Sequence, residues 1–133
     1  MDIAVGIDVG TTGVRAVAMD RAGAVVAKAE AAMPAPALIE GHLRQDAQIW
    51  WAAVSEALDR LGIAVERSRI AAIGVDGTSG TILPIDAGGS PLGLASMYND
   101  TAHASDAARV AALAPRDTAA RGATSPLALA VTT

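Results

Sequence analysis

Gly6-Ile7-Asp8-Val9-Gly10-Thr11-Thr12-Gly13, close to the start of the chain, is the stretch that decides the fold. Apolar residues alternate with small or polar ones before it, from Ile3 to Val9, and after it, from Val14 to Ala18. A period of two is typical of β-strands with a buried face, so the stretch is predicted to be the polar turn of a hairpin.

The chemistry of this turn suits a phosphate group and a cation. Gly10 and Gly13 are able to take positive φ, and without side chains they let a ligand approach backbone N–H groups that form a concave anion site. Thr11 and Thr12 add hydroxyl donors, and Asp8 stands at a strand end, where a carboxylate can hold a divalent cation or its bound water. The turn is therefore predicted to be a phosphate-and-magnesium loop. An ordinary hairpin turn is the alternative that the spacing leaves open.

The turn differs from two commoner phosphate loops. A Walker loop ends in Gly-Lys-Ser/Thr, but the first lysine of this chain is Lys28. A Rossmann loop needs a glycine two residues after the first and then a helix, whereas a second strand is predicted here. Neither of these patterns accounts for the stretch.

Composition limits the fold and the partners. A chain of 133 residues, 52% of them hydrophobic, is long enough for one domain with a core that aliphatic side chains must fill, because phenylalanine is absent. The absence of cysteine excludes disulfides, thiolate zinc sites and cysteine nucleophiles. A net charge of −4 with scattered arginines argues against a nucleic-acid partner. No apolar run reaches the roughly 18 residues of a membrane span and no signal peptide is evident, so a cytoplasmic protein that binds no membrane is expected.

The next elements extend the sheet and cover it. An extended apolar pattern over residues 24–32 predicts a third strand, which completes an antiparallel meander. A loop is expected from there to about Arg44. From Asp46 to Leu61 apolar residues recur every three or four positions, which predicts an amphipathic helix with Asp46 as its N-cap.

A continuous apolar run over residues 70–75 is predicted to be the central strand of the sheet, buried on both faces. The polar residues 76–80 follow at its carboxyl end, where open α/β sheets bind ligands, and a further strand is expected over residues 81–85. A serine-hydrolase elbow around Ser79 is not predicted, because Gly-x-Ser-x-Gly requires glycine where Thr81 stands.

An alanine-rich helix is expected over residues 101–113, with Asp100 or Thr101 as its N-cap and Pro115 after its end. A short apolar segment over residues 127–131 follows.

Four separated segments, taken in order and with their spacing, resemble one known family. They are Gly6–Gly13, Gln45-Asp46 with Trp50-Trp51 downstream, Ile73–Gly80, and Tyr98-Asn99-Asp100. Together they are similar to the N-terminal part of the FGGY carbohydrate kinases, and the resemblance covers essentially the whole chain. Within that family, the Asp-Gly-Thr-Ser-Gly-Thr string at 76–81 and the Tyr-Asn-Asp string look most like the xylulose and D-ribulose kinases.

The resemblance implies an α/β fold of the actin-like, ribonuclease H-like ATPase class. Its mixed sheet is expected to start with the antiparallel three-strand meander and to carry helices on both faces. Residues 1–133 are expected to form an incomplete N-terminal domain. A second actin-like domain, with the general-base aspartate, a second phosphate loop and the adenosine motif, is expected outside this chain, so these 133 residues alone are predicted to be inactive.

The resemblance also implies roles for particular residues. Asp8 is the expected catalytic and metal-binding residue, beside the transferred phosphate, and with Gly10, Thr11, Thr12 and Gly13 it is expected to bind the ATP phosphates. The sugar-binding residues that the resemblance implies are Gln45, Asp46, Gly77, Thr78, Ser79, Asn99 and Asp100. Hydroxyl side chains among them suit a polyol, because each hydroxyl both donates and accepts a hydrogen bond.

The sequence departs from the family pattern near Asp100. The arginine expected two residues later is Ala102, and the usual tryptophan is Tyr98. His103 is adjacent and is interpreted as a solvated helix residue, with replacement of the missing arginine as the alternative.

The reaction implied by the resemblance is transfer of the ATP γ-phosphoryl group to a hydroxyl of a ketopentose, xylulose or D-ribulose, with Mg²⁺ as cofactor. The expected partners are a small sugar and ATP, without nucleic acid or a membrane, and a homodimer is one assembly that the resemblance allows. Two alternatives stay open. The chain is a catalytically incomplete sugar-binding or interaction module, or the substrate is glycerol or another polyol.

Overall fold

The computed structural model describes residues 2–118, 121–122 and 125–132, which divide into two compact units. Unit 1 comprises the residues up to 35 together with residues 48–78, and unit 2 comprises residues 36–47 together with those from 79 onward. Each unit has a hydrophobic cluster of its own. No helix within the described ranges is both long and apolar enough to span a membrane.

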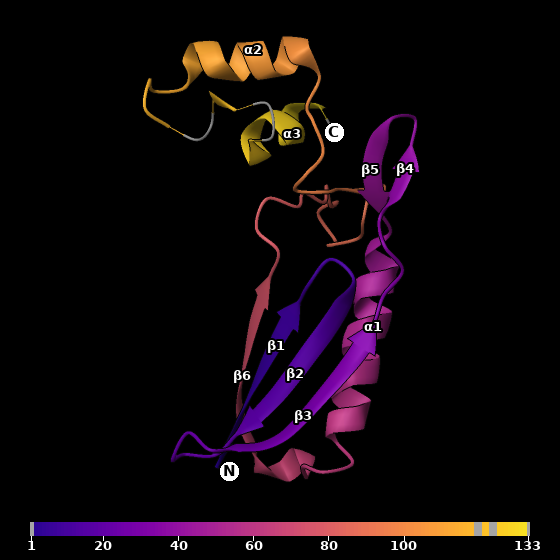
Figure 1. Cartoon of the computed structure of the whole chain (residues 1–133), viewed down its shortest axis with the longest axis vertical. Helices are drawn as coiled ribbons and strands as arrows, with labels where there is room; N and C mark the ends of the chain where they lie inside the picture. The colour runs from indigo at the N-terminus through magenta and orange to yellow at the C-terminus, as the bar shows by residue number, and fades with distance from the viewer. Residues whose placement is uncertain (1, 119–120, 123–124, 133) are drawn as a thin grey trace. The chain divides into compact units, whose positions relative to one another are not determined.

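Unit 1 is built on a four-stranded mixed sheet, whose strands lie side by side in Figure 1 in the order β3-β2-β1-β6. The strands are β1 (Ile3–Val9), β2 (Gly13–Met19), β3 (Val25–Ala32) and β6 (Ile70–Gly77). β1, β2 and β3 form the predicted antiparallel meander, and β6 runs parallel to β1. The predicted hairpin around the Gly6–Gly13 stretch is thus confirmed.

Helix α1 (Ala47–Leu61) covers one face of this sheet and confirms the predicted amphipathic helix, with Asp46 immediately before it. The alternate side chains of β1 that point to this face are buried, as the period of two predicted. The sheet and the helix together form the hydrophobic cluster of unit 1, which includes Ile3, Val5, Ile7, Val14, Ala16, Ala18, Ala53, Ala57 and Leu61. A 3₁₀ turn (η1, Arg67–Arg69) then leads into β6.

Two predictions for unit 1 are wrong in detail. β6 is an edge strand rather than the central one, and its Ile73 and Val75 are 58% and 69% exposed. A continuous apolar run indicates that both faces of a strand are apolar, but it does not specify which strands flank it. Helices on both faces are also not seen within unit 1, since among its described residues only α1 packs on the sheet.

Unit 2 contains a three-stranded antiparallel sheet in the order β4-β5-β7. Its strands are β4 (Ala37–Ile39), β5 (His42–Gln45) and β7 (Ala95–Ser96). The loop predicted up to Arg44 is therefore wrong, because β4 and β5 form a hairpin there. Its two turn residues, Glu40 and Gly41, both have positive φ (51° and 83°), as in the type I′ turns that match strand twist.

The strand predicted over residues 81–85 is also wrong. Ile82 and Ile85 make isolated bridges, to Ser96 and Pro91, and no continuous strand forms. A turn that starts at Asp86 lies between Ile85 and Pro91. The Asp86 Oδ1 accepts the N–H groups of Gly88 and Ser90, each at 2.8 Å.

Two short helices complete unit 2 and pack on each other (Figure 1). They are α2 (Ala104–Leu113) and α3 (Pro126–Thr132), and their cluster consists of Ala102, Val110, Ala128 and Leu129. α2 begins later than predicted, with His103 rather than Asp100 or Thr101 at its N-cap position. The Asp100 carboxylate instead contacts His42 and Arg44 of unit 2.

Candidate functional site

The turn between β1 and β2 is held in a fixed shape by backbone contacts. The Gly10 N–H donates to the Gly13 carbonyl at 3.0 Å, and the Met33 N–H donates to the Thr12 carbonyl at 2.8 Å. A Cβ on Gly10 would lie 3.1 Å from the Gly13 carbonyl oxygen, and one on Gly13 would lie 3.0 Å from the Ala31 carbonyl oxygen. A side chain at either position would therefore be in tight contact with the backbone, which favours glycine here.

Positive φ, which the sequence allows at Gly10 and Gly13, does not occur at either residue in the structure. Backbone handedness therefore does not explain these two glycines. The turn instead borders a hollow of about 280 Å³, lined by residues 10–15 and 30–32. A compact, glycine-lined turn beside such a hollow leaves room for a phosphate group at the backbone.

Thr78 lies beside this turn, at the end of β6. Its hydroxyl is 3.5 Å from the Thr11 hydroxyl, and its N–H donates to the Val9 carbonyl at 3.2 Å. The family resemblance implies sugar binding for Thr78 and phosphate binding for Thr11. Within unit 1, one predicted sugar residue therefore lies next to one predicted phosphate residue. Gly77, the last residue of β6, precedes this contact.

Asp8 lies in a row of charged residues on the open face of the sheet, opposite α1. Its register partners are Arg15 on β2 and Asp76 on β6, and Arg15 in turn pairs with Glu30 on β3. The Arg15 Nε is 3.6 Å from Asp8 Oδ2, and both side chains are half-exposed or more, so this ion pair contributes little to stability. The Asp8 carboxylate therefore stays accessible to a ligand.

Asp76 is a candidate that was not among the predicted site residues. Register partners on neighbouring parallel strands project from the same face, so Asp8 and Asp76 place two carboxylates next to each other beside the turn. A signal was present in the sequence, because Gly6-Ile7-Asp8 and Gly74-Val75-Asp76 are the same pattern in two apolar strands.

The donor chemistry of this pair fits Mg²⁺, which binds proteins through one or two carboxylates and completes its shell with water and substrate phosphates. In the described part of the chain, no group of three or more acidic, histidine or cysteine side chains is gathered for a metal. Asp8 and Asp76 thus offer two carboxylates for a cation and do not form a complete set of protein ligands.

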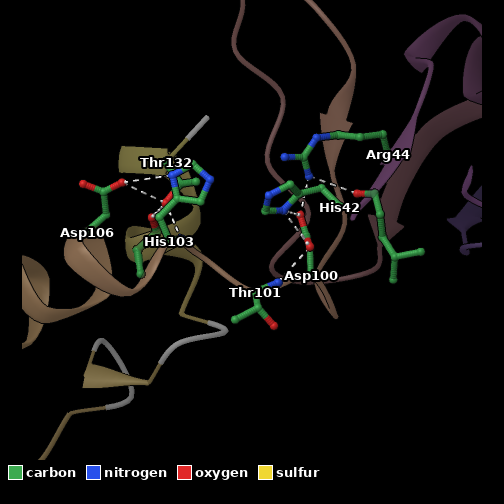
Figure 2. A network of polar contacts seen from close by, with 9 residues as sticks. His42, Arg44, Asp100, Thr101, His103, Asp106 and Thr132 are labelled. Carbon is green, nitrogen blue, oxygen red and sulfur yellow. Dashed lines mark hydrogen bonds and ion pairs between the residues drawn. The ribbon is translucent and has the colours of Figure 1, made fainter. Parts of the chain in front are cut away.

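A second cluster lies in unit 2 around Asp100 (Figure 2). Asp100 is 5% exposed and forms an ion pair with the Arg44 guanidinium. His42 Nδ1 lies 3.3 Å from both of its carboxylate oxygens, and the Thr101 N–H donates to Oδ1 at 2.8 Å. Burial alone would raise the pKa of Asp100, but these hydrogen bonds lower it below its ordinary value. Asp100 is therefore held as a carboxylate.

His42 and Arg44 were not predicted as site residues. They stand two positions apart on β5, so both reach Asp100 from one face of the strand. The sequence pattern predicts a loop at this hairpin, so it does not indicate that His42 and Arg44 lie on the same face of a strand. The family pattern has an arginine where this chain has Ala102. The cation that pairs with Asp100 in this chain is Arg44.

His103 borders the same cluster but does not bind Asp100 in the structure. Its ring lies 5.4 Å from that of His42, tilted by 59°, and its Nδ1 is 3.9 Å from Asp106 Oδ2 (Figure 2). It is largely exposed and precedes α2. Arg44, and not His103, is therefore the cation at Asp100.

The other predicted sugar residues occupy varied positions. Gln45 is buried in β5, where it pairs with Ala95 of β7. Asp46, Ser79 and Asn99 are exposed. Of these, Gln45, Asp46, Ser79 and Asn99 all belong to unit 2, together with Asp100.

Comparison with known proteins identifies the family. The N-terminal-domain profile of the FGGY family of carbohydrate kinases matches residues 3–120. A xylulose kinase from Streptomyces coelicolor is 33% identical over 109 residues, which are 81% of this chain and 22% of that protein. The chain therefore spans about a fifth of the length of this curated relative.

Solved structures of other kinases have a fold similar to that of this chain. The "xyloylose kinase" of Brucella ovis is 29% identical, with a TM-score of 0.75 over 83% of this chain and 24% of that one. The glycerol kinase of Plasmodium falciparum is 18% identical, with a TM-score of 0.65 over 89% of this chain and 24% of that one, and shows a shared fold alone. The expected actin-like ATPase fold is confirmed by these neighbours. The chain belongs to the FGGY family of carbohydrate kinases.

Proposed function

We propose that the protein is an ATP-dependent sugar kinase that phosphorylates a hydroxyl of a ketopentose, xylulose or D-ribulose. The observation that carries this proposal is the compact Gly10–Gly13 turn with the carboxylates of Asp8 and Asp76 beside it. The relative in Streptomyces coelicolor is a xylulose kinase, which supports this substrate class.

In this proposal the turn binds the ATP phosphates. Backbone N–H groups and the hydroxyls of Thr11 and Thr12 donate hydrogen bonds to phosphate oxygens. The close approach at Gly10 and Gly13 keeps the turn in one shape, so the phosphates are positioned without reorganisation of the loop.

Asp8, with Asp76 next to it, would hold Mg²⁺, which neutralises charge that develops on the phosphates during transfer. Arg15 keeps a cationic group within 3.6 Å of Asp8 and limits the repulsion between the two carboxylates. Phosphoryl transfer depends mainly on positioning and charge stabilisation, which is what these residues of unit 1 would contribute.

The sugar would be bound by Gln45, Asp46, Gly77, Thr78, Ser79, Asn99 and Asp100. Buried hydrogen bonds to sugar hydroxyls would discriminate against analogues that lack a hydroxyl. The general base, the second phosphate loop and the adenosine site are proposed to lie in further segments of the protein.

The test replaces Asp8 in the full-length protein. Asp8→Asn keeps the shape of the side chain but removes its charge, so it should lower ADP production with D-xylulose or D-ribulose by about a hundredfold or more. Sugar binding, measured by calorimetry, should change little. Asp59→Asn, at an exposed carboxylate on α1, is the matched control and should keep wild-type turnover. Wild-type turnover in Asp8→Asn would refute the role of Asp8.

A second candidate is a sugar-binding module without catalytic activity. Sugar binding without ADP production in the full-length protein would support this candidate over the first. Glycerol, or another polyol, is the substrate to include beside the ketopentoses.

A further inference from the structure

The Asp100 carboxylate has little capacity left for a ligand. Its Oδ1 accepts the Thr101 N–H at 2.8 Å, its Oδ2 accepts the Arg44 guanidinium, and His42 Nδ1 lies 3.3 Å from both oxygens (Figure 2). The two oxygens of a carboxylate offer about four acceptor positions. With the side chain 5% exposed, Asp100 serves the protein groups around it first.

Two side chains of β5 contact the Asp100 carboxylate and are more exposed than it is. His42 and Arg44 are 25% and 17% exposed, against 5% for the Asp100 side chain. A ligand therefore has readier access to this imidazole and this guanidinium than to the carboxylate.

The pairing with Asp100 determines what these two groups present. Because a carboxylate only accepts hydrogen bonds, His42 Nδ1 must carry the proton that faces it, and in the neutral ring Nε2 is then an acceptor. Arg44 uses its Nη1 for Asp100 and for the Leu43 carbonyl, at 3.1 Å in the second case. A guanidinium has five N–H donors, so others remain for a ligand.

We propose that His42 and Arg44 are specificity-determining residues that contact the sugar, and that Asp100, placed above among the sugar-binding residues, contributes to sugar binding by positioning these two side chains. His42 Nε2 accepts a hydrogen bond from a sugar hydroxyl, and the Arg44 guanidinium donates to a neighbouring sugar oxygen. An acceptor and a donor side by side match a polyol, in which each hydroxyl both donates and accepts. This inference rests on the proposed function and deepens it.

Two substitutions of His42 separate a sugar contact from a structural role. An asparagine amide reaches only the position of Nδ1, so His42→Asn keeps the hydrogen bond to Asp100 but removes the group at Nε2. A glutamine amide reaches the position of Nε2, so His42→Gln keeps the group that faces the sugar. The probes are D-xylulose and D-ribulose, titrated calorimetrically into the full-length protein without ATP.

We expect His42→Asn to weaken sugar affinity about tenfold, and His42→Gln to weaken it less. His103→Gln, at the exposed neighbouring ring, is the control and should bind like wild type. Arg44→Lys keeps the charge but loses the planar fork, so it should also weaken binding with an unchanged midpoint of thermal unfolding.

Equal affinity of wild type and His42→Asn would overturn the inference, whatever Arg44→Lys does. Such a result would leave the proposed function standing, since wild type still binds the sugar. Wild-type protein that binds neither ketopentose nor any polyol would instead refute the proposed function itself.

Discussion

Gly13 offers the sharpest test of the argument that close backbone approach shapes the phosphate turn. A Cβ at this position would lie 3.0 Å from the Ala31 carbonyl oxygen of β3, whereas ordinary contact begins at 3.4 Å. Gly13→Ala therefore requires a shift of about 0.4 Å between paired strands of the core. Gly6, on the open face of β1, is the matched control, because a Cβ there would meet no other atom within 4 Å.

The expected cost follows from two opposing effects. Overpacking of this kind costs about 1–3 kcal/mol, and the loss of backbone freedom in the unfolded chain returns somewhat less than 1 kcal/mol. A net destabilisation of about 1–2 kcal/mol is expected for Gly13→Ala. Gly6→Ala should be neutral or stabilising by up to about 1 kcal/mol, because glycine weakens a strand interior.

The assay is urea unfolding followed by tryptophan fluorescence. Both tryptophans, Trp50 and Trp51, lie on α1, so the signal reports on unit 1. With a slope of about 2 kcal/mol per molar urea, Gly13→Ala should lower the midpoint by about 0.5–1 M. Equal midpoints for Gly13→Ala and Gly6→Ala would refute the packing explanation of Gly13.

Two further predictions concern unit 2. Burial raises the pKa of Asp100, but hydrogen bonds led by the Thr101 N–H and then Arg44 lower it overall, so its contribution to stability is complete above the unfolded pKa and is lost as the pH falls through the folded one. Stability, followed by circular dichroism, should therefore fall below about pH 4, and less steeply in Asp100→Asn; an identical fall in both proteins would contradict this. Gly41 has a φ of 83° in the β4–β5 turn, so Gly41→Ala should destabilise the protein by about 1–2 kcal/mol, while Gly93→Ala, whose Cβ meets open space, should not. Equal midpoints of thermal unfolding for these two variants would show that the turn is not strained.

The sequence predicted well where a local pattern determines the structure. Alternation at Ile3, Val5 and Ile7 places β1 with one buried face, and the periodicity from Asp46 to Leu61 predicts α1 within one residue. These patterns succeed because burial of one face is a property of a single strand or helix.

Predictions that depended on neighbours were less successful. Whether β6 lies at the centre or the edge depends on strands that its own apolar residues do not specify. The β4–β5 hairpin has strands of 3 and 4 residues, too short for a period to be evident. Asp100 was expected near a helix start, but it pairs with Arg44, which lies 56 positions earlier in the chain.

The candidate site divides in the same way. The Gly10–Gly13 turn and Asp8 could be recognised from local chemistry, because small residues and a carboxylate at a strand end are the required groups. Asp76 repeats the pattern around Asp8, but only strand register shows that the two carboxylates are neighbours, and His42 and Arg44 become candidates only through their contacts with Asp100.

The most direct test of the central claim is transfer of the γ-phosphoryl group from ATP to a sugar by the full-length protein. Mass spectrometry of reactions with D-xylulose, D-ribulose and glycerol would detect the sugar phosphate, with and without Mg²⁺. We predict a ketopentose phosphate that forms only with ATP and Mg²⁺ and that is strongly reduced in Asp8→Asn. Absence of any phosphorylated sugar or polyol from a folded, ATP-binding protein would contradict the account.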